Sequence, residues 1–140
     1  MAVVLDASIA VKWVIAEHDR AQALRLRQIW ADLHEDIIAP PIFRAELANA
    51  LYQLTTRRVL SREEAKVAYG IVEPAVAIRE PSGLALLALT VTDRLALPAV
   101  YDGFYLALSD LEQCECWTAD RRLVQAAGGW PRLHLLAEIA

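Results

Sequence analysis

Ala2-Val3-Val4-Leu5-Asp6, at the start of the chain, is the stretch that decides the fold class. Its four apolar residues follow one another without polar alternation, which is typical of a strand buried on both faces of a parallel sheet. Helical spacing takes over from Ser8. The chain is therefore predicted to open with a buried strand and then a helix, with Asp6 at the carboxyl end of the strand.

The same order of strand and helix recurs along the chain. Apolar runs predict further strands at 37–40, 76–79, 115–118 and an edge strand at 133–136. Helical spacing and capping residues predict helices at 19–33, 41–54, from 61 onward, and at 82–96, 100–111 and 121–126. Alternating strands and helices imply right-handed crossovers, so we expect an α/β fold: a mostly parallel sheet of four to five strands with helices on both faces.

Composition limits the classes of protein that remain. The 140 residues are 56% hydrophobic, which is enough for one core, and without repeats or linkers we expect residues 1–140 to form a single domain. The apolar runs are shorter than the roughly 20 residues of a membrane span, and the first residues do not resemble a signal peptide. Cys114 and Cys116 are one residue apart, which disfavours a mutual disulfide. We therefore expect a cytoplasmic protein without membrane contact.

Four acids occupy the places where ligands bind in such sheets, beyond the carboxyl ends of the strands. Asp6 and Asp120 follow strands, and Glu46 and Asp102 lie on helices that begin near strand ends. Taken singly, Asp102 and Asp120 are equally explained as helix caps, and Glu46 as a solvated side chain. Taken together they would repel one another, by about 4 kcal/mol for a pair about 4 Å apart at an effective dielectric constant of about 20. A divalent cation would relieve that repulsion.

The donor types favour Mg²⁺ or Mn²⁺, which prefer oxygen ligands. The spacing of the three histidines, His18, His34 and His134, does not match a zinc site. The two cysteines are better explained as ordinary strand residues than as metal ligands. Carboxylate-bound Mg²⁺ or Mn²⁺ is typical of phosphoryl-transfer chemistry. The net charge of −4 provides no global basic field, so any nucleic acid must be held by local groups.

Four sequence blocks resemble, in order and spacing, the PIN-domain ribonucleases, and within them the VapC-type toxins of toxin–antitoxin pairs. The blocks are Asp6-Ala7-Ser8, 40–51 (PPIFRAELANAL), 101–108 (YDGFYLAL) and 117–123 (WTADRRL). The resemblance covers nearly the whole chain and implies a three-layer α/β/α PIN-like domain.

The resemblance also implies roles for individual residues. Asp6, Glu46, Asp102 and Asp120 would be the catalytic, metal-binding acids. Three further residues would assist them, although each has an ordinary structural explanation: Ser8 and Thr118 by hydrogen bonds, and Asn49 by orienting Glu46 or touching substrate. Cations near the blocks are weaker candidates for contacts with the substrate backbone: Lys12, Arg44, Arg121 and Arg122. For Arg44 the resemblance implies contact with an antitoxin as the alternative to contact with substrate. The tryptophans Trp13 and Trp117 are better explained by core packing than by base stacking.

The function implied is an Mg²⁺- or Mn²⁺-dependent endoribonuclease that hydrolyses RNA with metal-activated water. It would act as a toxin restrained by a cognate antitoxin protein, in a homodimer or a larger toxin–antitoxin assembly. A PIN-like RNA-processing nuclease without a toxin role and an inactive PIN-like protein-binding module remain alternatives. A haloacid-dehalogenase-like phosphatase is disfavoured because Ser8 stands where that family has a second Asp. Gly103, directly after Asp102, is expected to loosen the start of its helix.

Overall fold

A five-stranded parallel sheet forms the centre of the computed structural model, which describes residues 1–139. The strands are β1 (Ala2–Leu5), β2 (Asp36–Ala39), β3 (Ala77–Ile78), β4 (Glu115–Thr118) and β5 (Leu133–Leu135). Their order in the sheet is β3-β2-β1-β4-β5, and every neighbouring pair is parallel. The first strand is therefore the central one, and its residues Val3, Val4 and Leu5 are almost completely buried. The predicted parallel sheet is confirmed.

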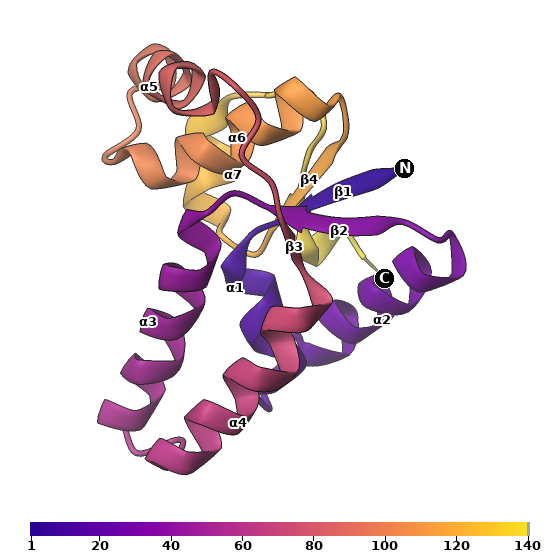
Figure 1. The fold of residues 1–140 in the computed structure, drawn as a ribbon, viewed down its shortest axis with the longest axis vertical. Helices are drawn as coiled ribbons and strands as arrows, with labels where there is room; N and C mark the ends of the chain where they lie inside the picture. Colours follow the sequence, from indigo (N-terminus) through magenta and orange to yellow (C-terminus); the bar gives the residue numbers. More distant parts are fainter. Residues whose placement is uncertain (140) are drawn as a thin grey trace.

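Helices cover both faces of this sheet. They are α1 (Ala7–Ala10), α2 (Arg20–Asp32), α3 (Ile42–Thr56), α4 (Arg62–Val72), α5 (Leu84–Leu95), α6 (Val100–Glu112) and α7 (Arg121–Ala127). Short 3₁₀ turns occur at Val11–Trp13, Glu73–Ala75 and Leu136–Glu138. Figure 1 shows α1 to α4 on one side of the sheet and α5 to α7 on the other. The three-layer α/β/α arrangement is thus the one expected from the sequence.

Local chemistry explains where several elements begin. Ser61 caps α4 through a capping box with Glu64: the Glu64 backbone N–H donates to the Ser61 hydroxyl at 3.0 Å, and the Ser61 backbone N–H donates to the Glu64 carboxylate at 2.9 Å. Gly83 has a φ of +83°, so α5 begins only at Leu84. The third strand is shorter than predicted because the Val76 N–H is donated to the Glu73 carbonyl in the preceding turn.

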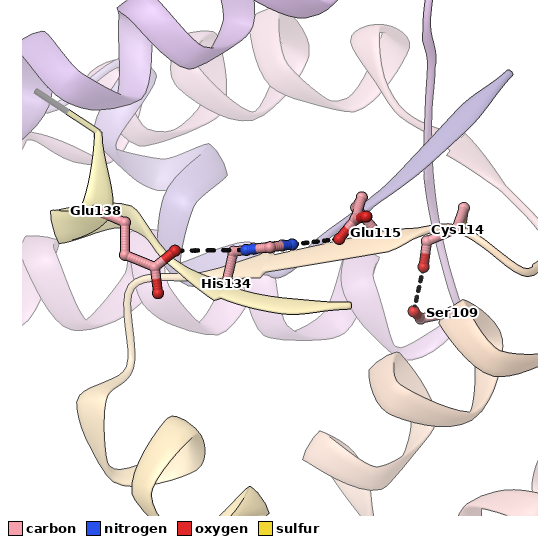
Figure 2. A network of polar contacts seen from close by, with 5 residues as sticks. All are labelled: Ser109, Cys114, Glu115, His134 and Glu138. Atoms are coloured by element: carbon pink, nitrogen blue, oxygen red, sulfur yellow. Dashed lines mark hydrogen bonds and ion pairs between the residues drawn. The ribbon is translucent and has the colours of Figure 1, made fainter. Parts of the chain in front are cut away.

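Polar contacts fasten the amino-terminal end of β4 to its surroundings (Figure 2). His134 of β5 contacts Glu115 through Nε2, and its Nδ1 lies 3.4 Å from a carboxylate oxygen of Glu138. The Ser109 hydroxyl on α6 donates to the Cys114 carbonyl at 2.5 Å. These contacts fix the edge strand and the end of α6 against β4, whose opposite end carries functional candidates.

Gly103 allows the close packing of α5 against α6. A Cβ atom at this position would lie 2.1 Å from the Thr92 Oγ1 atom and 2.9 Å from the Ala88 carbonyl oxygen, which is far inside van der Waals contact. The expectation that Gly103 loosens the helix is wrong: α6 runs without interruption through Gly103, and the glycine is buried. The residue is required because two helix backbones approach each other here.

Within residues 1–139, no single helix is both long and apolar enough to cross a membrane. Helices α5 and α6 meet that criterion only as a pair, and this pair is bent by 114°.

Candidate functional site

A cavity of about 470 Å³ opens at the carboxyl ends of the central strands. Its walls come from α1, α3, α6 and the β4–α7 connection, so segments far apart in sequence meet here. The structure brings all four predicted acids and two of the three predicted assisting residues to this cavity: its lining includes Asp6, Ser8, Glu46, Asn49, Asp102 and Asp120. The other lining residues are Ala7, Ile42, Ala45, Ala50 and Tyr101.

Asp6 is the most buried of the four acids, with only 6% of its surface exposed. The Thr118 hydroxyl donates to its Oδ2 atom at 2.6 Å, and the Ser8 hydroxyl donates to the same atom at 2.9 Å. Burial raises the pKa of Asp6, the two hydroxyl hydrogen bonds oppose that rise, and the nearby charge of Asp120 adds to it. The carboxylate is therefore held in one orientation at the base of the cavity.

Thr118 joins Asp6 to Asp120 because its hydroxyl also accepts a hydrogen bond. The Asp120 backbone N–H donates to Thr118 Oγ1 at 3.0 Å, and the Asp120 Oδ1 atom accepts from the Arg122 N–H at 2.9 Å as the N-cap of α7. Capping therefore uses one carboxylate oxygen, and no hydrogen bond from residues 1–139 is found at the other. Asp120 is a helix cap, and the same side chain also lines the cavity.

Glu46 enters the cavity from α3 and is held by a residue that the sequence analysis missed. The Tyr105 hydroxyl on α6 donates to Glu46 Oε1 at 2.5 Å. The pKa of Glu46 is raised to about 7, chiefly by burial; the negative charges of Asp6 and Asp102 contribute to the rise, and the Tyr105 hydrogen bond opposes it. Tyr105 lies one helical turn after Asp102, so the spacing alone could have placed it on the same face of α6 as Asp102, but not beside Glu46 on α3.

Asp102 is in the first turn of α6, but it is not the cap, since Ala99 occupies the N-cap position. Burial raises the pKa of Asp102 to about 6, and the charges of Asp6 and Asp120 contribute to the same rise. Each of the four acids thus lies in the electrostatic field of at least one other. Without a counter-ion, the raised pKa values of Asp6, Glu46 and Asp102 mean that these three carboxyl groups hold protons more tightly than ordinary ones do.

The donor chemistry of the cavity suits a hydrated Mg²⁺ or Mn²⁺ ion. All its candidate ligands are oxygen atoms, and histidine and cysteine are absent from its lining. Across residues 1–139, however, no group of three or more histidine, cysteine, aspartate or glutamate side chains is arranged to hold a metal ion. The fit is therefore to an ion that keeps several waters and binds one or two carboxylates directly, as Mg²⁺ does.

The predicted substrate-contacting cations divide into two pairs. Lys12 binds Glu17 at 2.6 Å and Asp19 at 2.9 Å, with only 13% of its side chain exposed, and Arg44 lies 3.3 Å from Glu73. Neither residue lines the cavity. Arg121 and Arg122 are also outside the cavity lining, but they are exposed at the start of α7, next to Asp120, and form no ion pair with the described part of the chain.

A comparison with models of protein families shows to which family the chain belongs. The model of the PIN domain matches residues 3–129, which is most of the sequence and includes all four acids. The chain belongs to the PIN domain family. No curated protein matches it by sequence.

Solved structures share this PIN fold. The chain is similar to VapBC2 from Rickettsia felis, solved with a DNA fragment from its promoter (14% identity, 96% of this chain and 97% of that one, TM-score 0.70). It is also similar to a toxin–antitoxin complex from Klebsiella pneumoniae (14% identity, 96% and 98%, TM-score 0.69). A third is Mycobacterium tuberculosis VapC20, a toxin that cleaves the sarcin–ricin loop (16% identity, 89% and 95%, TM-score 0.63). At these identities the likeness establishes the fold.

Proposed function

We propose that this PIN domain protein is an Mg²⁺- or Mn²⁺-dependent endoribonuclease and the toxin of a toxin–antitoxin pair. The observation that carries the nuclease proposal is the gathering of four carboxylates from four separate segments in one cavity. Like charges are brought together in this way where a cation is bound, because their mutual repulsion otherwise destabilises the fold.

The mechanism assigns a task to each group of residues. Asp6, Glu46, Asp102 and Asp120 would hold the ion, which supplies Lewis-acid stabilisation and an activated water for hydrolysis of a phosphodiester. Thr118 and Ser8 orient Asp6 through their hydroxyl donors. Tyr105 orients Glu46 in the same way through its own hydroxyl donor. The exposed Arg121 and Arg122 would attract the RNA backbone beside Asp120.

The toxin role draws on the solved relatives. Two of those reported above are toxin–antitoxin assemblies, and a third is a toxin that cleaves RNA. We therefore propose a cognate antitoxin protein as the partner, a homodimer or a larger toxin–antitoxin assembly as the working state, a single PIN domain over residues 1–140 and a cytoplasmic location.

RNA cleavage by the purified protein tests the nuclease proposal. We expect Mg²⁺ or Mn²⁺ to support cleavage of RNA, a chelator to abolish it, and Asp6→Asn and Asp102→Asn each to reduce it by at least about a hundredfold. Asp93→Asn is the matched control because Asp93 is an exposed acid on α5, outside the cavity. If wild type and the two cavity variants are equally active, or equally inactive on a broad RNA panel, the proposal is wrong.

Growth measurements test the toxin role separately. Induced expression of the wild-type chain should arrest growth, Asp6→Asn should not, and co-expression of the adjacent small gene should relieve the arrest. An active nuclease that leaves growth unaffected at high expression would instead be an RNA-processing enzyme. A correctly folded chain without nuclease activity that still binds a partner would be a protein-binding module.

A further inference from the structure

Tyr101 presents an exposed aromatic ring at the edge of the acidic cavity. It is the second residue of α6, directly before Asp102, and 52% of its surface is accessible to solvent. It lines the cavity, yet it forms no hydrogen bond with the part of the chain that the structure describes. The ring is therefore available to a ligand that enters the cavity.

The cavity lining combines two kinds of surface. Beside the four acids, Ile42, Ala45 and Ala50 of α3 join Tyr101 in supplying apolar surface. A ligand that suits both kinds of surface carries a phosphate for a cation held by the acids and a flat apolar face for the tyrosine ring. A nucleotide has both features, and the volume of about 470 Å³ lies within the range of pockets that hold small molecules.

We infer that Tyr101 stacks against a nucleobase next to the phosphodiester that is cut. This inference rests on the proposed nuclease function and adds to it a residue that contacts a base. Aromatic stacking needs an unpaired base that can leave its own stack, so the nucleotide that Tyr101 contacts must be unpaired when it binds. Every base has a π face, so Tyr101 contributes affinity at one nucleotide position with little preference among the four bases.

Other aromatic side chains near the site are already engaged. Tyr105 is fully buried and bound to Glu46. Trp13 is 3% exposed, in agreement with the core packing favoured above, and its indole N–H donates to the Ala23 carbonyl at 3.2 Å. The Trp117 ring stacks on His134, with centroids 4.8 Å apart. Tyr101 is the ring that both reaches the cavity and remains accessible among residues 1–139.

The first test compares three variants on a short single-stranded RNA whose cut site has been mapped. Tyr101→Ala should raise KM and weaken RNA binding by about fivefold to a hundredfold, with a smaller change in kcat, whereas Tyr101→Phe should recover most of the lost affinity. Tyr52→Ala is the matched control, because Tyr52 is 62% exposed but lies outside this cavity. Binding is measured by fluorescence anisotropy in an Asp6→Asn background, so it does not depend on turnover.

The second test identifies the stacked base. An abasic nucleotide is placed at each position flanking the cut in turn, and each RNA is bound to proteins with Tyr101 or Ala at position 101. At one position the affinity lost through the abasic nucleotide and the affinity lost through Tyr101→Ala should come from the same contact. Tyr101→Ala then has no further effect on binding of that abasic RNA. Equal losses from Tyr101→Ala on every RNA, or no loss at all, would overturn the stacking role. So would a variant impaired only in binding a partner protein.

The outcome remains separable from the nuclease proposal. A wild-type protein that cleaves RNA while Tyr101→Ala binds and cleaves equally well refutes only the stacking role. A wild-type protein that binds RNA through Tyr101 without cleaving it supports the stacking surface and refutes the nuclease proposal.

Discussion

At the scale of single residues, Tyr105 ties Glu46 on α3 to α6 by one hydrogen bond of 2.5 Å. Tyr105→Phe keeps the buried ring but removes the donor from a half-buried carboxylate. Losing a hydrogen bond to a charged group costs about 1.5 to 3 kcal/mol, so the free energy of unfolding at pH 8 should fall by about that amount in urea titrations. Tyr69→Phe is the control, since no hydrogen bond of the half-buried Tyr69 hydroxyl is found in residues 1–139. A Tyr105→Phe protein as stable as wild type would contradict this account.

Thr118 is the second residue whose hydroxyl connects two acids, because it donates to Asp6 and accepts from the Asp120 N–H. Thr118→Val preserves shape but removes both bonds. Groups that orient a metal ligand typically affect metal affinity by about tenfold or more, so the Mn²⁺ concentration needed for half-maximal thermal stabilisation should rise by about that factor. Thr118→Ser, which keeps the hydroxyl, should remain close to wild type. Equal Mn²⁺ responses for Val and Ser would show that orientation of Asp6 by Thr118 has no role.

At the scale of elements, Gly103 sets the distance between α5 and α6. Gly103→Ala should lower the free energy of unfolding by about 1 to 3 kcal/mol, because the added methyl meets Thr92 Oγ1 and the Ala88 backbone. Thr92→Ala in the same chain should restore only part of the loss, since the Ala88 carbonyl remains 2.9 Å away. Gly70→Ala on α4 is the matched control, with open space at its Cβ, and should stabilise by about 0.5 to 1 kcal/mol. Chemical denaturation measures the free energy of unfolding of the two single variants and the double variant. A Gly103→Ala protein as stable as wild type would contradict the packing argument.

The elements also show what a sequence can and cannot predict. Apolar runs such as Ala2–Leu5 predict strands because burial on both faces leaves no alternation, and the shared carboxyl edge of parallel strands then brings Asp6 and Asp120 together. The bond from Tyr105 to Glu46 joins residues 59 apart on two different helices, so helical periodicity cannot reveal it. The role of Gly103 likewise depends on how closely two helices approach, which local propensity does not contain.

At the scale of the whole molecule, the cavity concentrates the negative charge. Four of the 18 acids line it, and the remaining acids equal the 14 lysines and arginines in number. The pKa of Glu46 is raised from 4.5 to about 7 and that of Asp102 from 3.8 to about 6. At a pH between the ordinary and the raised pKa of each acid, the folded chain binds more protons than the unfolded chain. Its free energy of unfolding therefore falls as the pH rises through that range.

A bound divalent cation would reverse that loss, because it replaces the protons as the counter-charge and binds only the folded state. Without metal, we expect the urea concentration at the unfolding midpoint to decrease as the pH is raised from 5 to 8. Millimolar Mg²⁺ or Mn²⁺ should raise this midpoint at pH 8 but hardly at pH 5, where protons compete for the carboxylates. Glu46→Gln should flatten the pH dependence, since Glu46 has the larger raised value of the two. Glu63→Gln, at an exposed acid on α4, should leave it intact. A midpoint that stays constant from pH 5 to pH 8 in wild type would mean that burial and mutual repulsion together disfavour the charged carboxylates too weakly to need a cation.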